Sequence, residues 1–169
     1  MIDVELEGAE QINAQLLRVL ERTGDLSPLM SDMGEHMVNS THNNFESSTS
    51  PDGTAWAANS ATTFGSMLGA SDTNKSGRVN KRGSNKIMNK RPLIANHTLM
   101  QSIHYEAAST GVTIGTNLVY GAMMHFGGSK EAYPNLWGDI PARNYLGASE
   151  DDVVILIEMA SQYLIDEGS

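Results

Sequence analysis

A 40-residue polar stretch in the middle of the chain, residues 57–96, constrains the fold more than any other feature. It is rich in Ser, Thr, Asn, Gly and Lys and has no hydrophobic periodicity. Since loops longer than about 15 residues are uncommon in compact domains, we interpret it as an inserted arm that becomes ordered on a partner. Phe64, Met67 and Leu68 predict one helical turn within it. The core of a single domain, residues 1–169, must then come mainly from the two flanks.

Charge is distributed as unevenly as hydrophobicity. The formal net charge is −9, yet seven of the 11 basic residues lie within 17 residues that contain no acid. This basic arm has three interpretations: it binds nucleic acid phosphates, it is a solvated loop, or it lies on the acidic surface of a neighbouring subunit. It contains no aromatic residue on which a base could stack. Its basic residues are Lys75, Arg78, Lys81, Arg82, Lys86, Lys90 and Arg91.

The residues before the arm predict two helices and a turn. A strand or extended lead-in over residues 3–6 precedes a first helix over residues 8–23. The second helix is expected to have Ser27 as its N-cap and Pro28 as its first residue, and to end near residue 46. A Pro-Asp-Gly turn follows, and Trp56 comes directly after it, filling either a pocket or, as we favour, the edge of the core. The buried face of the second helix is Met30, Met33, Met37, Thr41 and Phe45.

The residues after the arm predict a hairpin and a final helix. Two alternating apolar stretches flank a turn at residues 109–111. One or two helical turns over residues 119–125 end at Gly127-Gly128. The last helix begins with Ser149 as its N-cap and three acids in its first turn. The alternating residues are Leu99, Ile103, Tyr105, Ala107, Val112 and Ile114, and the buried face of the last helix is Val153, Leu156, Ile157, Ala160 and Leu164.

These patterns predict an α+β fold: a small antiparallel sheet packed by two N-terminal helices and one C-terminal helix, with a long inserted basic arm. No window approaches the ~20 apolar residues of a membrane span. The acidic first residues have no apolar core segment, so we expect no signal peptide.

No catalytic set is recognisable. The chain has no cysteine, which excludes disulfides and thiolate metal sites, and it has no nucleophile elbow, phosphate-binding glycine loop or zinc-protease motif. Asp32 and His36 share a helix face, and we interpret them as a surface pair. His125 is expected to hydrogen-bond a loop carbonyl. We therefore expect no enzyme activity, no metal and no cofactor; a small hydrolase using His125 or the Asp32/His36 pair is the weakest alternative.

The segment from Tyr120 to Gly147 is the most distinctive part of the chain. It contains Arg143, whose five donors are held in a fixed direction behind a proline. Arg143 pairs either with Asp139 or Glu150 of its own chain, or with an acid of a neighbouring copy. The loop between Gly128 and Ile140 offers Tyr133, Leu136 and Trp137 as apolar anchors for a contact between subunits.

Six short motifs occur in a fixed order. They are Phe45 before a polar stretch; Pro51-Asp52-Gly53-Thr54-x-Trp56; Leu93-Ile94 followed by Leu99 and Ser102-Ile103; Val112-x-Ile114-Gly115; Tyr120-x-Ala122-x-x-His125-Phe126-Gly127-Gly128; and Ile140-Pro141-Ala142-Arg143-x-x-Leu146-Gly147. In this order they resemble the phage virion morphogenesis family, the tail-completion proteins of Mu-like and related tailed phages. One departure is Asn96-His97-Thr98, where the family often has Thr-Gly.

The resemblance implies a structural subunit of the virion neck or tail, assembled in the host cytoplasm. It implies a ring, a hexamer, that caps the head-proximal end of the tail and meets the tail tube protein and the head connector proteins. The order of elements is also similar to that of tail-terminator-like neck proteins of other tailed phages. A head-side connector or stopper of the neck, and a nucleic-acid-binding module using residues 75–91, stay as alternatives. We predict a subunit or partner interface formed by Trp56, Tyr120, His125, Phe126, Trp137, Arg143 and Tyr145.

Overall fold

The computed structural model describes residues 17–18, 20–21, 25–136 and 138–167. The extended lead-in predicted at residues 3–6 lies outside these residues. Most of the first predicted helix, residues 8–23, also lies outside them, and its described residues, 17–18 and 20–21, are helical. The remaining elements show a mixed α and β architecture with the sheet flanked by N-terminal and C-terminal helices, which confirms the predicted fold class.

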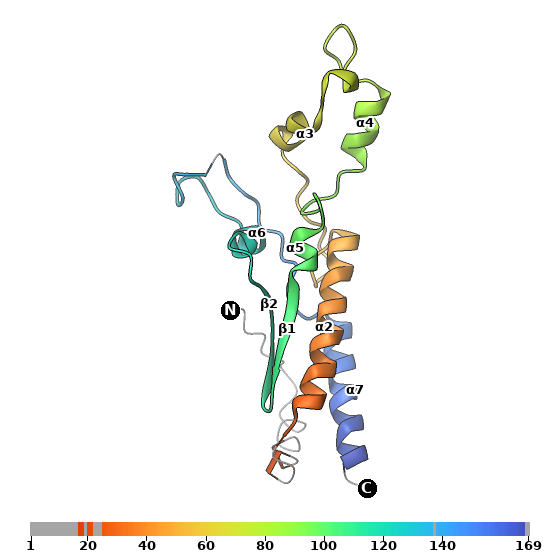
Figure 1. Ribbon diagram of the computed structural model, residues 1–169, viewed down its shortest axis with the longest axis vertical. Coiled ribbons are helices and arrows are strands. Elements are labelled where there is room, and N and C mark those ends of the chain that lie inside the picture. Colours follow the sequence, from red (N-terminus) through yellow and green to blue (C-terminus); the bar gives the residue numbers. More distant parts are fainter. Residues whose placement is uncertain (1–16, 19, 22–24, 137, 168–169) are drawn as a thin grey trace.

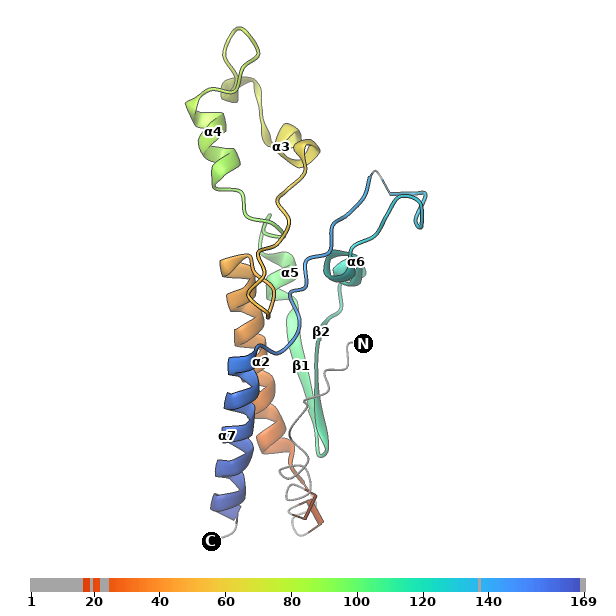
Figure 2. The ribbon, with the colours of Figure 1, turned by 180° about the vertical axis from the view of Figure 1, so that it is seen from behind.

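Two long helices form one side of the body. α2 (Ser27–Ser47) and α7 (Glu150–Glu167) lie side by side and run in opposite directions (Figures 1 and 2). The predicted N-cap of α2 is wrong by one position: the helix already includes Ser27, whose N–H donates to Asp25 Oδ1 over 2.8 Å. The N-cap of α7 is confirmed, because Ser149 Oγ accepts from the N–H of Asp152 and the Asp152 carboxylate accepts from the N–H of Ser149.

An antiparallel hairpin covers α2. β1 (Ile103–Ala108) pairs with β2 (Gly111–Thr116), which confirms the predicted hairpin. Ile103 lies opposite Thr116, and Ala108 lies opposite Gly111. The hairpin packs closely on the middle of α2 at Gly34. A Cβ built on Gly34 would lie 2.5 Å from Tyr105 Cδ2, so only glycine permits this approach.

The prediction that the first strand pattern includes Leu99 is wrong. Leu99 lies in α5 (Thr98–Gln101), one helical turn that precedes β1. His97, the N-cap of this turn, has φ of 61°, a left-handed conformation that glycine adopts at least cost. The left-handed residue, His97, therefore lies within Asn96-His97-Thr98, the segment where the family often has Thr-Gly.

Two hydrophobic clusters stabilise the body. The lower cluster joins the start of α2 to α7 through Leu26, Leu29, Met30 and Ala160, with Ala107 and Val112 of the hairpin packed against it. The upper cluster joins the end of α2 to segments on either side of the arm through Phe45, Trp56, Leu99, Ile103 and Tyr145. The predicted face of α2 supplies residues to both clusters, whereas the predicted face of α7 supplies Ala160 and Leu164 to the lower cluster.

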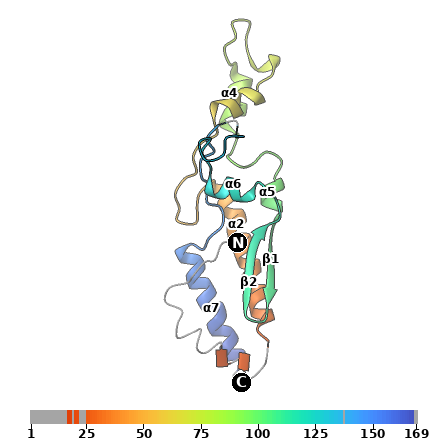
Figure 3. The ribbon, with the colours of Figure 1, turned by 90° about the vertical axis from the view of Figure 1, so that its left-hand side faces the viewer.

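The central polar segment forms an arm that rises above the body (Figures 1 and 3). It contains α3 (Ala61–Met67), the 3₁₀ turn η1 (Ala70–Asp72) and α4 (Lys81–Met88). α3 confirms the predicted helical turn at Phe64 and Met67, whereas Leu68 follows the helix with an extended backbone. α4 was not predicted, although its N-cap, Asn80, accepts from the N–H groups of Arg82 and Gly83.

A second projection follows α6 (Gly121–Phe126), a short helix at the predicted position. A loop leaves the glycine pair at its end and returns where Gly128 and Ile140 form an isolated antiparallel bridge. Gly127 has φ of 73°, and a Cβ there would lie 2.6 Å from the backbone nitrogen of Ala142. No helix among the described residues is long and apolar enough to cross a membrane.

Two Gly→Ala substitutions in helices are expected to have opposite effects. Gly34→Ala gains helix propensity of about 1 kcal/mol, but overpacking a well-filled contact costs about 1–3 kcal/mol, so we expect a net loss of stability. Gly65→Ala in α3 meets nothing within 4 Å, so we expect it to stabilise its helix. Thermal unfolding and hydrogen exchange of the arm test this pair; a Gly34→Ala protein more stable than the parent would contradict the described approach of Tyr105.

Candidate assembly surfaces

Tyr145 lies at the centre of the upper cluster and is only 1% exposed. Its hydroxyl donates to the carbonyl of Gly121 over 2.9 Å, and its ring centroid lies 5.1 Å from that of Phe45. Burial, together with nearby Tyr120, raises the pKa of Tyr145 to about 12. Trp56 packs edge-on against Phe45, and its indole N–H donates to the carbonyl of Asn144. Trp56 therefore occupies the edge of the core, the interpretation we favoured.

His125 is buried beside Tyr145, and the predicted hydrogen bond to a loop carbonyl is wrong. Its Nδ1 accepts from the N–H of Tyr145 over 3.3 Å, so this nitrogen carries no proton. Burial lowers the pKa of His125. A neutral imidazole satisfies this backbone donor because the loop offers His125 an N–H group rather than a carbonyl oxygen.

Arg143 is buried and pairs with neither Asp139 nor Glu150. Its Nε donates to the carbonyl of Ala57 over 2.9 Å, and its Nη2 donates to the carbonyl of Ala58 over 3.0 Å. The guanidinium thus holds the segment that leads into the arm. The prediction of an acid partner within the chain is wrong because two backbone carbonyls, 86 and 85 residues away in sequence, occupy the donors.

Exposed apolar side chains flank α6. Val119 is 98% exposed, Tyr120 is 44% exposed, and Phe126 at the other end of the helix is 64% exposed. We call these three residues the α6 surface. The predicted interface residues therefore divide: Trp56, His125, Arg143 and Tyr145 are buried within the chain, whereas Tyr120 and Phe126 are accessible to a partner. Trp137 lies outside the described residues.

The basic arm is organised around one buried carboxylate, Asp72. Lys86 Nζ lies 2.6 Å from Asp72 Oδ2, and Arg82 Nε lies 3.4 Å from Oδ1. The N–H of Gly69 also donates to Oδ2 over 3.0 Å. The hydrogen bond from Lys86, then that from Gly69, holds the pKa of Asp72 below its ordinary value. Sequence reasoning missed Asp72 because it precedes the acid-free window by three residues.

The other arm cations divide between its base and its far end. Arg91 donates to the carbonyl of Glu46 over 2.8 Å and fastens the base of the arm to α2, whereas Lys90 donates to the carbonyl of Ile94 within the base itself. At the far end, Lys75, Arg78 and Lys81 are exposed. The ion pairs found among the described residues of the arm all involve Asp72, which leaves these three cations available to a partner.

A polar cluster joins α2 to α7, and it replaces the predicted Asp32/His36 pair. His36 Nε2 lies 2.8 Å from Asp152 Oδ1, while Ser40 Oγ donates to Oδ2 over 2.7 Å. Burial alone would raise the pKa of Asp152, but hydrogen bonds from Ser149, Ser40 and His36 hold it below its ordinary value. This cluster is structural, since each member satisfies another across the helix pair. Within the described part of the chain, no group of three His, Asp or Glu side chains is placed to hold a metal ion.

Comparison with known proteins gives the family. The model of the phage virion morphogenesis family matches residues 8–165. This chain belongs to that family. The resemblance drawn from the six motifs is thus confirmed over nearly the whole chain. The chain is also 26% identical to the Mu-like prophage FluMu G protein 2 of Haemophilus influenzae over 163 residues, which is 96% of each protein. No solved structure matches the chain significantly.

Replacing Asp72 by asparagine is expected to open the arm without unfolding the body. The substitution keeps the side-chain shape but removes the charge that Lys86 and Arg82 share. We expect hydrogen-exchange protection to fall in residues 69–88 while the body keeps its protection. Asp32→Asn on the exposed side of α2 is the matched control, because it makes the same charge change away from the arm. Unchanged protection of α4 in Asp72→Asn would contradict the role of Asp72.

Proposed function

We propose that this protein is a tail-completion subunit, a structural protein that forms a ring at the head-proximal end of a phage tail. Its family supports a role in virion assembly. The finer assignment rests on the motif order and on a surface suited to protein contact. Its partners would be further copies of itself, the tail tube protein and the head connector proteins. We expect six copies in the ring and no catalytic turnover.

The proposal is supported most by the contrast between large apolar side chains that are buried and others that are exposed at α6. Phe45, Trp56 and Tyr145 are buried, yet Val119 and Phe126 are mostly exposed at α6. Exposed large apolar side chains of this kind are typical of protein interfaces, because burying them on a partner gains apolar contact area. α6 is held rigidly, since the Tyr145 hydroxyl bonds the first residue of the helix.

The geometry also fits a ring. A closed ring needs a heterologous contact, in which one patch of a subunit meets a different patch of the next. The chain has an exposed arm and an exposed loop after α6 that extend from the same end of an otherwise compact body (Figures 1 and 2). Two unlike projections give each copy two unlike surfaces for its neighbours.

The function is tested by complementation. Tails produced without this protein are expected to fail to join heads, and addition of the purified chain should restore infective particles. Tails that join heads normally without the protein would contradict the proposal. Restoration by chain added to finished heads but not by chain added to tails would place the protein on the head side instead.

Phe126→Ala is expected to reduce this restoration about tenfold or more, as truncation of an interface aromatic commonly does. Its effect on folding should stay within about 1 kcal/mol because Phe126 is mostly exposed. Val154→Ala on α7 is the matched control, since Val154 is 54% exposed and distant in sequence from α6. Equal activity of both variants, with thermal midpoints close to the parent's, would exclude the α6 surface as a partner contact.

A further inference from the structure

α4 presents an open cationic face at the top of the arm. Lys81, Arg82, Asn85, Lys86 and Asn89 line one open hollow along this helix. Lys81, Asn85 and Asn89 follow one another at intervals of four residues, as do Arg82 and Lys86, so the two neighbouring rows line one side of α4. Arg82 and Lys86 pair with Asp72, and these ion pairs fix the orientation of this side of α4. Lys81 is exposed and has no carboxylate partner among the described residues of the arm.

A groove with the opposite charge lies on the body. It runs between the turn at residues 50–53 and the first turn of α7, with a volume of about 620 Å³. Asp52, Glu150 and Asp151 line it, and no basic residue does. The hydrogen bond from the backbone N–H of Thr54 lowers the pKa of Asp52, so this carboxylate stays charged. The start of α7 adds only about half a positive charge, which leaves the groove negative.

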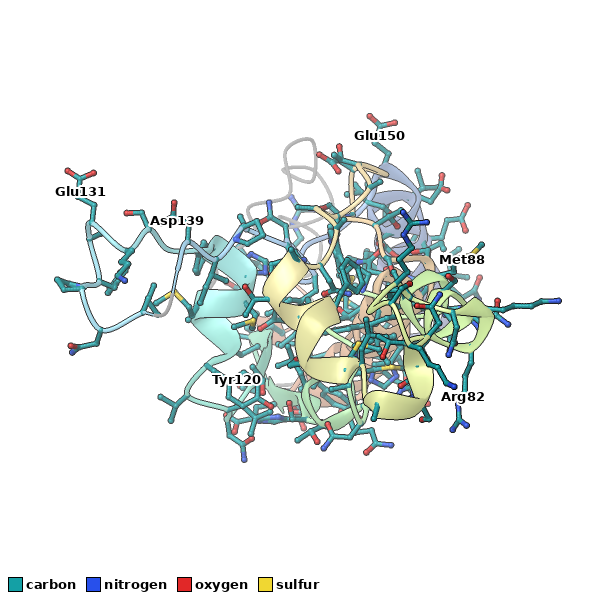
Figure 4. The ribbon with its side chains drawn as sticks, turned by 90° about the horizontal axis from the view of Figure 1, so that it is seen from above. Arg82, Met88, Tyr120, Glu131, Asp139 and Glu150 are labelled. Atoms are coloured by element: carbon teal, nitrogen blue, oxygen red, sulfur yellow. The ribbon has the colours of Figure 1, made fainter. Side chains whose placement is uncertain are left out.

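The α4 face cannot fill the groove of its own chain. The arm rises beyond the end of the body to which it is attached (Figures 1 and 3). Viewed along the long axis, Arg82 and Glu150 point away from one another (Figure 4). A partner for each surface must therefore come from outside the chain.

The charge of the two parts favours a second copy of this chain as that partner. Residues 70–91 hold seven basic residues and one acid, whereas the rest of the chain holds four basic residues and 19 acids. A body so acidic repels DNA phosphates and other acidic bodies but attracts the arm. DNA is further disfavoured because residues 75–91 contain no aromatic side chain on which a base could stack.

We propose that the α4 face of one copy docks into the acidic groove of the next copy, between residues 50–53 and Glu150–Asp151. This inference rests on the proposed function, since it names the heterologous contact of the ring. The contact is reciprocal around the ring: every copy gives an arm to one neighbour and receives an arm from the other. Its strength should fall as salt rises, because the charges lie on exposed surfaces.

The test is a charge-swap experiment on the full-length chain. The arm variant Lys81→Glu/Asn85→Glu reverses the α4 face and leaves Arg82 and Lys86 on Asp72. The groove variant Glu150→Lys/Asp151→Lys reverses the groove and leaves the Ser149–Asp152 cap in place. Sedimentation velocity over a concentration series measures self-association, and circular dichroism verifies folding.

We expect each variant alone to self-associate about tenfold more weakly than the parent, or not at all. An equimolar mixture of the two should recover association, because the acidic arm of one fits the basic groove of the other. The control Arg18→Glu/Asn39→Glu makes the same change of charge at two exposed residues that belong neither to the arm nor to the groove, and it should associate like the parent.

Three outcomes would overturn the inference. They are a parent chain that does not self-associate, an arm variant that associates like the parent, and folded variants whose mixture fails to recover association. If the arm variant instead loses binding to a labelled DNA duplex and keeps its self-association, the arm is a nucleic-acid surface. A failure of this contact leaves complementation by the parent chain unaffected, so it is distinguishable from a failure of the proposed function.

Discussion

The structure depends on the buried run from Arg143 to Tyr145. This run satisfies hydrogen-bonding groups of segments that are far apart in sequence: the base of the arm, the indole of Trp56 and the start of α6. Each of these groups is buried or partly buried, and an unpaired buried polar group costs about 1–3 kcal/mol. The same short run therefore fixes both projections to the body. An assembly protein needs this rigidity, because surfaces on mobile projections lose entropy when they dock.

A second constraint is electrostatic. The body carries a large excess of acid, and identical acidic bodies repel one another in solution. The arm is a folded unit with its own internal carboxylate, Asp72, so its cations do not collapse onto the acidic body. The protein keeps opposite charges apart within one chain, an arrangement that suits association between chains.

The local pattern predicted much of the fold. The spacing of Met30, Met37 and Phe45 identified the buried face of α2, and the Ser149 cap located the start of α7. Alternation identified the hairpin, apart from Leu99, where a left-handed residue starts a helical turn instead. These features are predictable because each depends on residues within a few positions of one another.

The site residues were less predictable because their partners are distant. His36 meets Asp152, 116 residues later, and no sequence spacing reveals that pair. Arg143 was expected to meet an acid, but the guanidinium donates to the carbonyls of Ala57 and Ala58. Charge clustering identified the basic arm, yet it concealed Asp72, the one acid that organises it. Phe126 is accessible whereas Tyr145 is buried, and this difference cannot be predicted from residue type alone.

The most direct measurement is the position and number of copies of this protein in purified tails, determined by cryo-electron microscopy. We predict a closed ring at the head-proximal end of the tube, with the arm of each copy on the body of the next. Copies found at the distal end, copies distributed along the tube, or a particle that contains none would contradict it.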